Sequence, residues 1–168
     1  MDYAIRRAQT RDVRAIRRLI DANVASGCLL DKPTVTLYED VQEFWVACSD
    51  AGGEVIGCGA LHVMWEDLAE IRSIAVGAAH QGRGAGHELV ATLLAAAREL
   101  GVSRVFVLTF AVGFFGRHGF REISGDTATT PEVYAELLRS YDEGIAEFLD
   151  LDRVKPNTLG NTRMLVRL

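Results

Sequence analysis

The stretch from Ala78 to Val90, AAHQGRGAGHELV, places glycines and one arginine between an apolar run and a segment with helical spacing of apolar residues. The first turn of a helix leaves backbone N–H groups unpaired and carries a partial positive charge. Glycines let those N–H groups approach an anion, and the guanidinium of Arg83 can close over it. These residue types favour a phosphate-binding loop, with a plain glycine-rich connector as the alternative.

Three phosphate-binding patterns compete for this stretch. The dinucleotide pattern G-x-G-x-x-G fails because the third glycine, Gly86, comes one position early. A P-loop needs a lysine and a hydroxyl residue after its last glycine, and Gly82 is followed by arginine and glycine. The third pattern, Q-x-x-G-x-G, matches from Gln81 to Gly86 and stands directly between an expected strand and an expected helix.

Hydrophobic periodicity predicts the elements that position this loop. Alternating or continuous apolar runs predict strands at 3–8, 44–49, 54–65, 69–76, 104–109 and 162–168, with a hairpin turn at 50–53. Helical spacing predicts a first helix capped by Thr10 and a second through Val41 and Phe44. Further helical segments are expected after the glycines, closed by Gly101, at 112–120 as a short helix or turn, and from Pro131 to Leu149. The acidic segment 141–152 is expected to be a solvated helix face.

Length and composition limit the classes of protein. The 168 residues fit one α/β or α+β domain in three layers. The net charge of −5 disfavours a nucleic-acid partner, and no apolar run reaches the ~20 residues of a membrane helix. The N-terminus has no apolar signal core, so we expect a cytoplasmic protein. Three cysteines without metal spacing, Cys28, Cys48 and Cys58, are expected to be reduced and mostly buried.

A second motif makes the glycine pattern specific. Downstream of it, VFVLT is followed by FFGRHGF, which supplies Phe115, Gly119 and Phe120. The two motifs in this order resemble the GCN5-related N-acetyltransferase (GNAT) superfamily, which binds acetyl-coenzyme A. The resemblance implies a single N-acetyltransferase domain over 1–168, with a mixed, mostly antiparallel sheet flanked by helices. It also implies no metal, and acetyl-CoA bound by the backbone and side chains of Ile74, Ala75, Val76, Gln81, Gly82, Arg83, Gly84, Ala85 and Gly86.

Further segments resemble one branch, the acetyltransferase domain of N-acetylglutamate synthase and its short, stand-alone relatives. The branch implies transfer of acetyl to the α-amine of glutamate, or of glutamine, as the first step of arginine biosynthesis. We expect the short, stand-alone form, without the amino-acid-kinase domain of the longer enzymes. The segments that carry the resemblance are GCLLDK (27–32), GCGAL (57–61), AEIRSIAV (69–76), FVLT (106–109), FFGRHGF (114–120) and NTR (161–163).

The resemblance also implies roles in catalysis. Glu70 stands in an apolar strand where the superfamily often carries its general base; the alternatives are a solvated glutamate or a partner of Arg72. Backbone N–H groups around Ile74–Val76 are the implied donors to the oxyanion. Many relatives protonate the leaving thiolate with a tyrosine at the position of Phe115, which has no proton to give. Water or Thr109 are the remaining candidates for that acid.

Fixed cations would select an amino acid by its carboxylate. The branch places a substrate-binding cation at Lys32, in the loop that also holds Leu30, and Arg72 and Arg163 are the other candidates. Each could equally be a surface cation. Lys155 could be a fourth. The histidines His62, His87 and His118 lack metal spacing and are expected to be hydrogen-bonded surface or half-buried residues.

Two other functions stay open from the sequence. The chain could acetylate another small amine or a protein N-terminus, or it could be a non-catalytic acyl-CoA-binding sensor. The partners expected are a small amino-acid substrate, no nucleic acid and no membrane. A homodimer is common among relatives, and the sequence does not establish one.

Overall fold

The structure is a computed structural model that describes residues 3–25, 27, 29, 31–50, 53–124, 129–154 and 160–168. It divides into two compact units, the first made of residues 1–62 and 71–100 and the second of 63–70 and 101–168. Among the described residues, seven strands are hydrogen-bonded in the order β1-β2-β3-β4-β5-β7-β6. β4 and β5 pair in parallel, whereas β1–β2, β2–β3, β5–β7 and β6–β7 pair antiparallel. The predicted mixed, mostly antiparallel sheet is confirmed.

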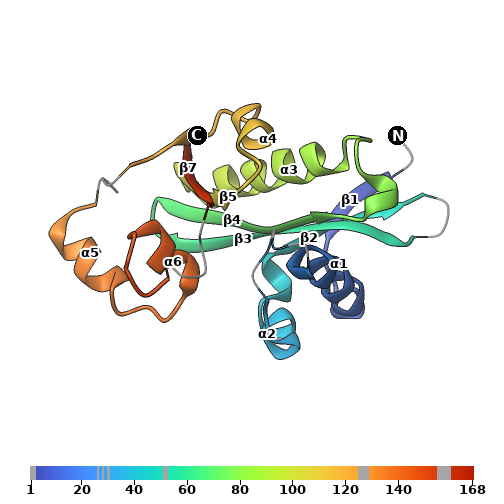
Figure 1. The fold of residues 1–168 in the computed structure, drawn as a ribbon, viewed down its shortest axis with the longest axis horizontal. Helices are drawn as coiled ribbons and strands as arrows, with labels where there is room; N and C mark the ends of the chain where they lie inside the picture. The colour runs from blue at the N-terminus through green and yellow to red at the C-terminus, as the bar shows by residue number, and fades with distance from the viewer. Residues whose placement is uncertain are drawn as a thin grey trace. The chain divides into compact units, whose positions relative to one another are not determined.

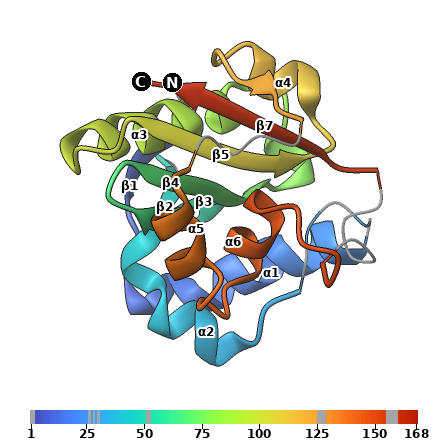
Figure 2. The ribbon, with the colours of Figure 1, turned by 90° about the vertical axis from the view of Figure 1, so that its left-hand side faces the viewer.

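In the first unit, α1 and α2 lie on one face of strands β1 to β3, and α3 lies on the opposite face (Figures 1 and 2). The strands of this unit are β1 (Tyr3–Arg7), β2 (Phe44–Ser49), most of β3 (Val55–Trp65) and the end of β4 (Leu68–Val76). Its helices are α1 (Val13–Ala25), α2 (Thr34–Glu39) and α3 (Ala85–Glu99), with 3-10 turns at Thr10–Asp12, Val41–Glu43 and Ala78–His80.

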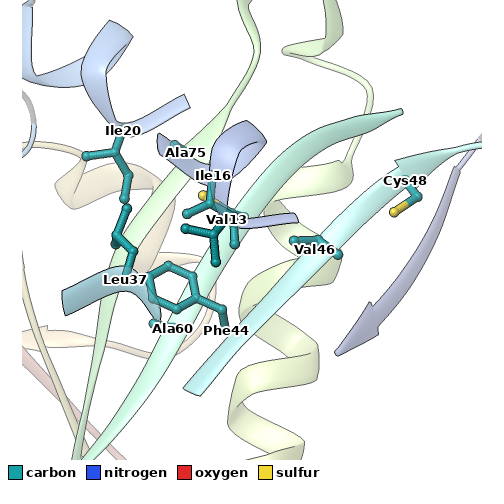
Figure 3. Packing of buried hydrophobic residues seen from close by; sticks show 10 residues of the cluster. Val13, Ile16, Ile20, Leu37, Phe44, Val46, Cys48, Ala60 and Ala75 are labelled. Carbon is teal, nitrogen blue, oxygen red and sulfur yellow. The ribbon is translucent and has the colours of Figure 1, made fainter. Parts of the chain in front are cut away.

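Side-chain alternation along β2 explains the two layers. Val46 and Cys48 point to the α1 side, where they pack with Val13, Ile16 and Ile20 of that helix (Figure 3). The intervening Ala47 packs on the α3 side with Ile56, Ala85 and Leu89. The spacing of three and four residues in α1 gives it one apolar stripe, as its sequence predicts.

In the second unit, α5 and α6 lie together on one side of β5 and β7, and α4 lies on the other side (Figures 1 and 2). Phe106 of β5 packs edge-to-face on Phe148 of α6, with 5.5 Å between ring centres. Met64, Leu68, Leu137 and Ile145 belong to the same core. The elements are β5 (Arg104–Thr109), α4 (Val112–Gly116), β6 (Arg121–Glu122), α5 (Pro131–Leu137), α6 (Glu143–Phe148) and β7 (Thr162–Arg167), with the adjoining ends of β3 and β4.

Two predicted helix boundaries in the first unit are wrong. Thr10 is not the cap of the first helix, because the Asp12 carboxylate accepts the backbone N–H of Gln9 (2.7 Å) and the chain makes a 3-10 turn before Val13. The second helix ends at Glu39, and Phe44 begins β2 because its side chain joins the buried face of that strand. Ala51 and Gly52 of the predicted hairpin turn lie outside the described residues.

The predicted helix from Pro131 to Leu149 is wrong as a single element. It is two helices, since the first ends at Leu137 and Asp142 caps the second by accepting the backbone N–H of Ile145 (3.1 Å). The prediction of a solvated face at 141–152 is also wrong, because Glu147 and Phe148 are both buried. In the described part of the chain, no helix combines the length and apolarity that a membrane span requires.

Candidate active site

The glycine loop is tied back to the end of β4. Gly77 donates its N–H to the carbonyl of Ile56 (2.8 Å), and His80 donates to the carbonyl of Gly77 (2.8 Å). The side-chain amide of Gln81 donates to the carbonyl of Val76 (3.1 Å). The residue that begins the Q-x-x-G-x-G pattern therefore closes the loop on its own strand.

Two glycines of this loop adopt conformations that other residues rarely take. Gly82 has φ of +75° and Gly84 has φ of +91°, both in the left-handed region. Gly84 is also the N-cap of α3, so no side-chain oxygen occupies the place where a capping residue would accept the first-turn N–H groups. The first helical bond runs from Glu88 N to Gly84 O (3.0 Å), and the N–H groups of Ala85 and Gly86 precede it in the first turn, where an α-helix offers no acceptor four residues back.

This geometry fits an anionic coenzyme. Gln81, Gly82 and Arg83 are exposed, and a Cβ added at Gly82 would meet no described atom within 4 Å. The 15-residue helix α3 directs its positive end at this open backbone. The structure thus brings together Gln81, Gly82, Arg83, Gly84, Ala85 and Gly86 as one loop, and their part in coenzyme binding stays a prediction.

The strand that leads into the loop is bent before its end. Ser73 has φ of +57°, and its carbonyl accepts a bond from the thiol of Cys58 (3.5 Å). Cys58 is buried, as the sequence predicts, and burial raises its pKa to about 12, which disfavours the reactive thiolate. Beyond the bend, Ala75 packs on the α1 side, whereas Ile74 and Val76 pack on the α3 side. Their backbone N–H groups as oxyanion donors remain a prediction.

Arg72 belongs to a charged cluster of the first unit. Its guanidinium Nη2 lies 3.8 Å from Oε2 of Glu43, whose Oε1 lies 2.7 Å from Nδ1 of His62. The Arg72 side chain is only 11 % exposed, which excludes the alternative of an ordinary surface cation. His62 is a half-buried, hydrogen-bonded histidine as expected. Glu43 carried no sequence signal, because it stands in a turn that was expected to be helical.

The loop after α1 is described only in part. Arg17 of α1 donates to the backbone carbonyl of Lys32 and pairs with Asp21 and Asp31. The arginine therefore fixes the backbone on which Lys32 stands. Leu30, Cys28 and Lys155 lie outside the described residues.

Glu70 is buried in the second unit. It is 6 % exposed and pairs with Phe106 in the β4–β5 ladder, so it is no solvated glutamate. A Cβ added at Gly144 would overlap the Glu70 carboxylate. The carboxylate therefore lies directly against the backbone of the first turn of α6, and only glycine fits between them.

Glu147 is a buried carboxyl group that sequence reasoning missed. It is 5 % exposed, and within the described ranges its Oε1 atom has no hydrogen-bond partner. Burial, followed by the negative charges of Glu143 and Glu70, raises the pKa of Glu147 to about 7. A strongly acidic helix gave no hint of burial, although Ile145, Phe148 and Leu149 share the spacing of an apolar helix face.

Arg163 stabilises the end of α6. Its Nε donates to the carbonyl of Glu147 (3.0 Å), and its Nη2 donates to the carbonyl of Phe148. These are carbonyls of the last turn, which a cation stabilises. Burial lowers the pKa of Arg163. The predicted substrate-binding arginine thus has structural partners, and its role toward a substrate stays a prediction.

Phe115, in the helix α4 after β5, stands in apolar surroundings at the position where many relatives carry a tyrosine. Phe115 is 4 % exposed and packs edge-to-face on Phe114 and Phe120, at 5.1 and 5.3 Å between ring centres. Thr109, the alternative acid, accepts the N–H of Ala111 through its hydroxyl oxygen (2.9 Å). That bond leaves the hydroxyl proton available for donation elsewhere.

Comparison with known proteins identifies one family. Residues 26–120 match the model of the acetyltransferase (GNAT) family. The chain is 59% identical over 165 residues to an amino-acid acetyltransferase of Mycobacterium tuberculosis, covering 98% of this chain and 94% of that protein. It is 34% identical over 139 residues to an amino-acid acetyltransferase of Neisseria meningitidis, covering 82% of this chain and 31% of that protein.

Solved structures agree with these matches. The crystal structure of Mycobacterium tuberculosis Rv2747 in complex with CoA and NLQ has a TM-score of 0.93 at 59% identity, covering 98% of this chain and 99% of that one. N-acetylglutamate synthase of Neisseria gonorrhoeae with coenzyme A and N-acetyl-glutamate has a TM-score of 0.76 at 26% identity, covering 99% and 35%. The chain therefore spans about a third of the length of the Neisseria proteins.

Proposed function

Because the chain belongs to the acetyltransferase (GNAT) family, we propose that it transfers acetyl from acetyl-CoA to the α-amino group of glutamate, or of glutamine, as the first step of arginine biosynthesis. The main support for the proposal is that strand β4 connects a buried carboxylate to the glycine loop. It presents a buried carboxylate at Glu70 and leads, after Val76, into the left-handed glycines at the bare start of α3.

The glycine loop would hold the diphosphate of acetyl-CoA. The N–H groups of Ala85 and Gly86 and the guanidinium of Arg83 supply the donors, and Gly82 and Gly84 let the phosphates approach the backbone. Acetyl-CoA supplies an acetyl group activated as a thioester. The backbone N–H groups at Ile74–Val76 are the proposed donors to its carbonyl oxygen.

Glu70 would act as the general base. An α-amine has a pKa near 8, so only about a tenth of it is neutral at pH 7. The Glu70 carboxylate takes the proton from the ammonium group, and the amine nitrogen then bonds to the acetyl carbon as the carbon–sulfur bond breaks. The nitrogen loses its second proton as the amide forms, and that proton passes through water or the Thr109 hydroxyl to the departing sulfur, which has a pKa of about 8.5 as a thiol.

Fixed cations would select the acceptor. We assign the α-carboxylate of the amino acid to Arg72, whose guanidinium is oriented by Glu43. Lys32 and Leu30 would line the acceptor loop, and Arg163 would act by holding α6 in place over Glu70. The complex of the Neisseria gonorrhoeae enzyme with N-acetyl-glutamate supports glutamate as the acceptor, and the neutral amide of glutamine would need one cation fewer.

A thiol-release assay tests the proposal. Free CoA is measured with acetyl-CoA and each amino acid in turn, and we expect glutamate or glutamine to accelerate its release most. If no amino acid accelerates release while acetyl-CoA still binds, the protein is an acyl-CoA-binding sensor. If another small amine is the best acceptor, the proposed acceptor is wrong.

The variant Glu70→Gln tests the base. It keeps the size of the side chain and removes the carboxylate, so we expect kcat to fall about 100-fold or more. The Kd for acetyl-CoA, measured by calorimetry, should change less than about twofold. The matched control is Glu122→Gln, an exposed glutamate on β6 of the same unit, which should leave kcat unchanged. Equal losses in kcat and in coenzyme affinity would contradict the role of Glu70.

A further inference from the structure

The first turn of α6 brings two carboxyl groups of the second unit together. The Glu70 carboxylate lies against Gly144, and Glu147 follows three residues later on the same helix. Residues three apart lie on one side of a helix. Glu147 is therefore on the side of α6 that covers Glu70, and the negative charge of Glu70 acts on it.

Packing fixes the position of Glu147. Phe148 packs on Phe106, the ladder partner of Glu70, with 5.5 Å between ring centres. Arg163 donates to the carbonyls of Glu147 and Phe148 from β7. The backbone that carries Glu147 is thus held from two strands, which fixes the point from which its side chain extends.

The charges around Glu147 are mostly negative. Glu143 and Asp150 act on it from its own segment and Glu70 acts from β4, whereas Arg163 of β7 is the positive group among the causes of its shift. Its Oε1 atom is buried and, among the described residues, accepts or donates no hydrogen bond. A negative charge on Glu70 disfavours ionisation of Glu147, after burial and the charge of Glu143, and by the same interaction a charge on Glu147 would disfavour ionisation of Glu70.

We propose that Glu147 is a positioning residue for acetyl transfer, whose ionisation sets how strongly Glu70 holds the proton taken from the acceptor amine. This inference rests on the proposed function. The proton leaves the amine nitrogen and forms an O–H bond on Glu70, and Glu147 gains or loses its own proton to solvent. A negative charge on Glu147 would disfavour the ionised form of Glu70 and so strengthen Glu70 as a base, whereas a neutral Glu147 would not.

The kinetic test compares wild type with Glu147→Gln, which keeps the shape of the neutral acid and cannot ionise. The ratio of their kcat values should be near one at pH 6 and rise to about threefold to tenfold at pH 8, with a midpoint near pH 7. The folded fraction of each protein is measured by circular dichroism at each pH, and kcat is expressed per folded molecule. In the Glu70→Gln background, Glu147→Gln should have no further effect, because it acts through Glu70.

Two matched variants support the comparison. Glu136→Gln removes a carboxylate on α5, where the side chain is 55 % exposed and pairs with Arg139 (3.2 Å); its kcat ratio should be flat with pH, because Glu136 is not among the charges that act on Glu147. Glu147→Asp keeps an ionisable group and should keep the pH-dependent ratio. A flat ratio for Glu147→Gln, or the same effect in the Glu70→Gln background, would overturn the proposal.

A titration without coenzyme separates this inference from the proposed function. With side-chain carboxyl carbons of glutamate labelled with ¹³C, Glu147 should titrate near pH 7 and the Glu70 signal should show an inflection at the same pH. Glu147→Gln should remove both. If the inflection persists in the variant, the two groups are not coupled and the inference fails, even if acetyl transfer to glutamate is confirmed. If no amino acid is acetylated, the proposed function fails while the coupling is still measured.

Discussion

Asp12 in the first unit and Glu147 in the second are buried to the same extent, and their carboxyl groups behave in opposite ways. Each residue is 5 % exposed. Asp12 accepts both arms of the Arg6 guanidinium (2.7 and 3.0 Å) and the N–H of Gln9 (2.7 Å), and these bonds, led by Arg6, lower its pKa. Glu147 lacks such a donor at Oε1, and burial raises its pKa to about 7.

The difference shows that the hydrogen-bond donors around a buried carboxyl group, rather than its degree of burial, determine the direction in which its pKa shifts. Asp12 is ionised across the physiological range, and its bonds join β1 to the start of α1. It serves the scaffold that carries the glycine loop. Glu147 changes charge near neutral pH, beside a second carboxylate that we propose as the base. In the first unit the buried carboxylate of Asp12 stabilises the fold, and in the second unit the buried carboxyl group of Glu147 can titrate.

The largest expected effect comes from Asp12→Asn, which removes that carboxylate. The amide cannot accept two charged bonds from Arg6, so the free energy of unfolding at pH 7 should fall by about 2 to 3 kcal/mol. Because the folded pKa of Asp12 is lowered, its contribution is present above pH 3.8 and is lost as the pH falls through the folded value. Urea unfolding at pH 7 and pH 3 should therefore show a difference that shrinks in acid.

The control for that experiment is Asp21→Asn on α1. Asp21 also pairs with an arginine, Arg17, but its side chain is 52 % exposed. Its substitution should alter the stability much less than Asp12→Asn does. Similar losses in the free energy of unfolding for the two variants would show that the burial of Asp12 does not strengthen its ion pair.

The next largest effect on the free energy of unfolding concerns Glu147→Gln, and its dependence on pH is opposite to that of Asp12→Asn. Since the folded pKa is raised from 4.5 to about 7, the stabilising contribution of the neutral acid is complete below pH 4.5 and is lost as the pH rises through 7. Between pH 5 and pH 8 the stability of wild type should therefore fall relative to the variant by about 2 kcal/mol. Urea unfolding of both proteins across this range measures the difference, and parallel pH profiles would contradict the raised pKa.

The smallest expected effect on stability comes from Gly144→Ala. The new methyl group overlaps the Glu70 carboxylate and must displace it, while alanine favours the helix, so the net loss should be about 1 kcal/mol. The displaced carboxylate should lower kcat about tenfold. Gly113→Ala in α4 is the control, since a Cβ there would meet no described atom within 4 Å. An unchanged kcat for Gly144→Ala would contradict the role of Glu70 as the general base.

Periodicity predicted most of the fold because most elements follow from their own residues. Val13, Ile16 and Ile20 mark the buried stripe of α1, and the alternating residues of β2 mark its two packed faces. The glycine loop was also predictable, since the left-handed positions at Gly82 and Gly84 require glycine whatever surrounds them. These features depend on local chemistry, which a sequence displays directly.

The environment of the carboxyl groups could not be predicted in the same way. Glu147 is buried because α6 packs through Phe148 onto Phe106, a contact between residues far apart in the chain. The break between α5 and α6 depends on the capping bond of Asp142, which competes with a continuous helix of similar composition. The ion pair of Glu43 with Arg72 likewise joins a turn to a strand. Tertiary contacts decide each of these.

The glycine at the N-cap of α3 has a consequence for the dynamics of the first unit. The side-chain oxygen of a serine or aspartate there would accept a hydrogen bond from the first-turn N–H groups. Gly84 has no such oxygen, so a bound anion can accept these bonds instead. The amide hydrogens of Ala85 and Gly86 should therefore exchange quickly with solvent deuterium in the free protein and slowly once the coenzyme is bound. The start of α3 would then act as a built-in reporter of coenzyme occupancy, readable without any reaction taking place.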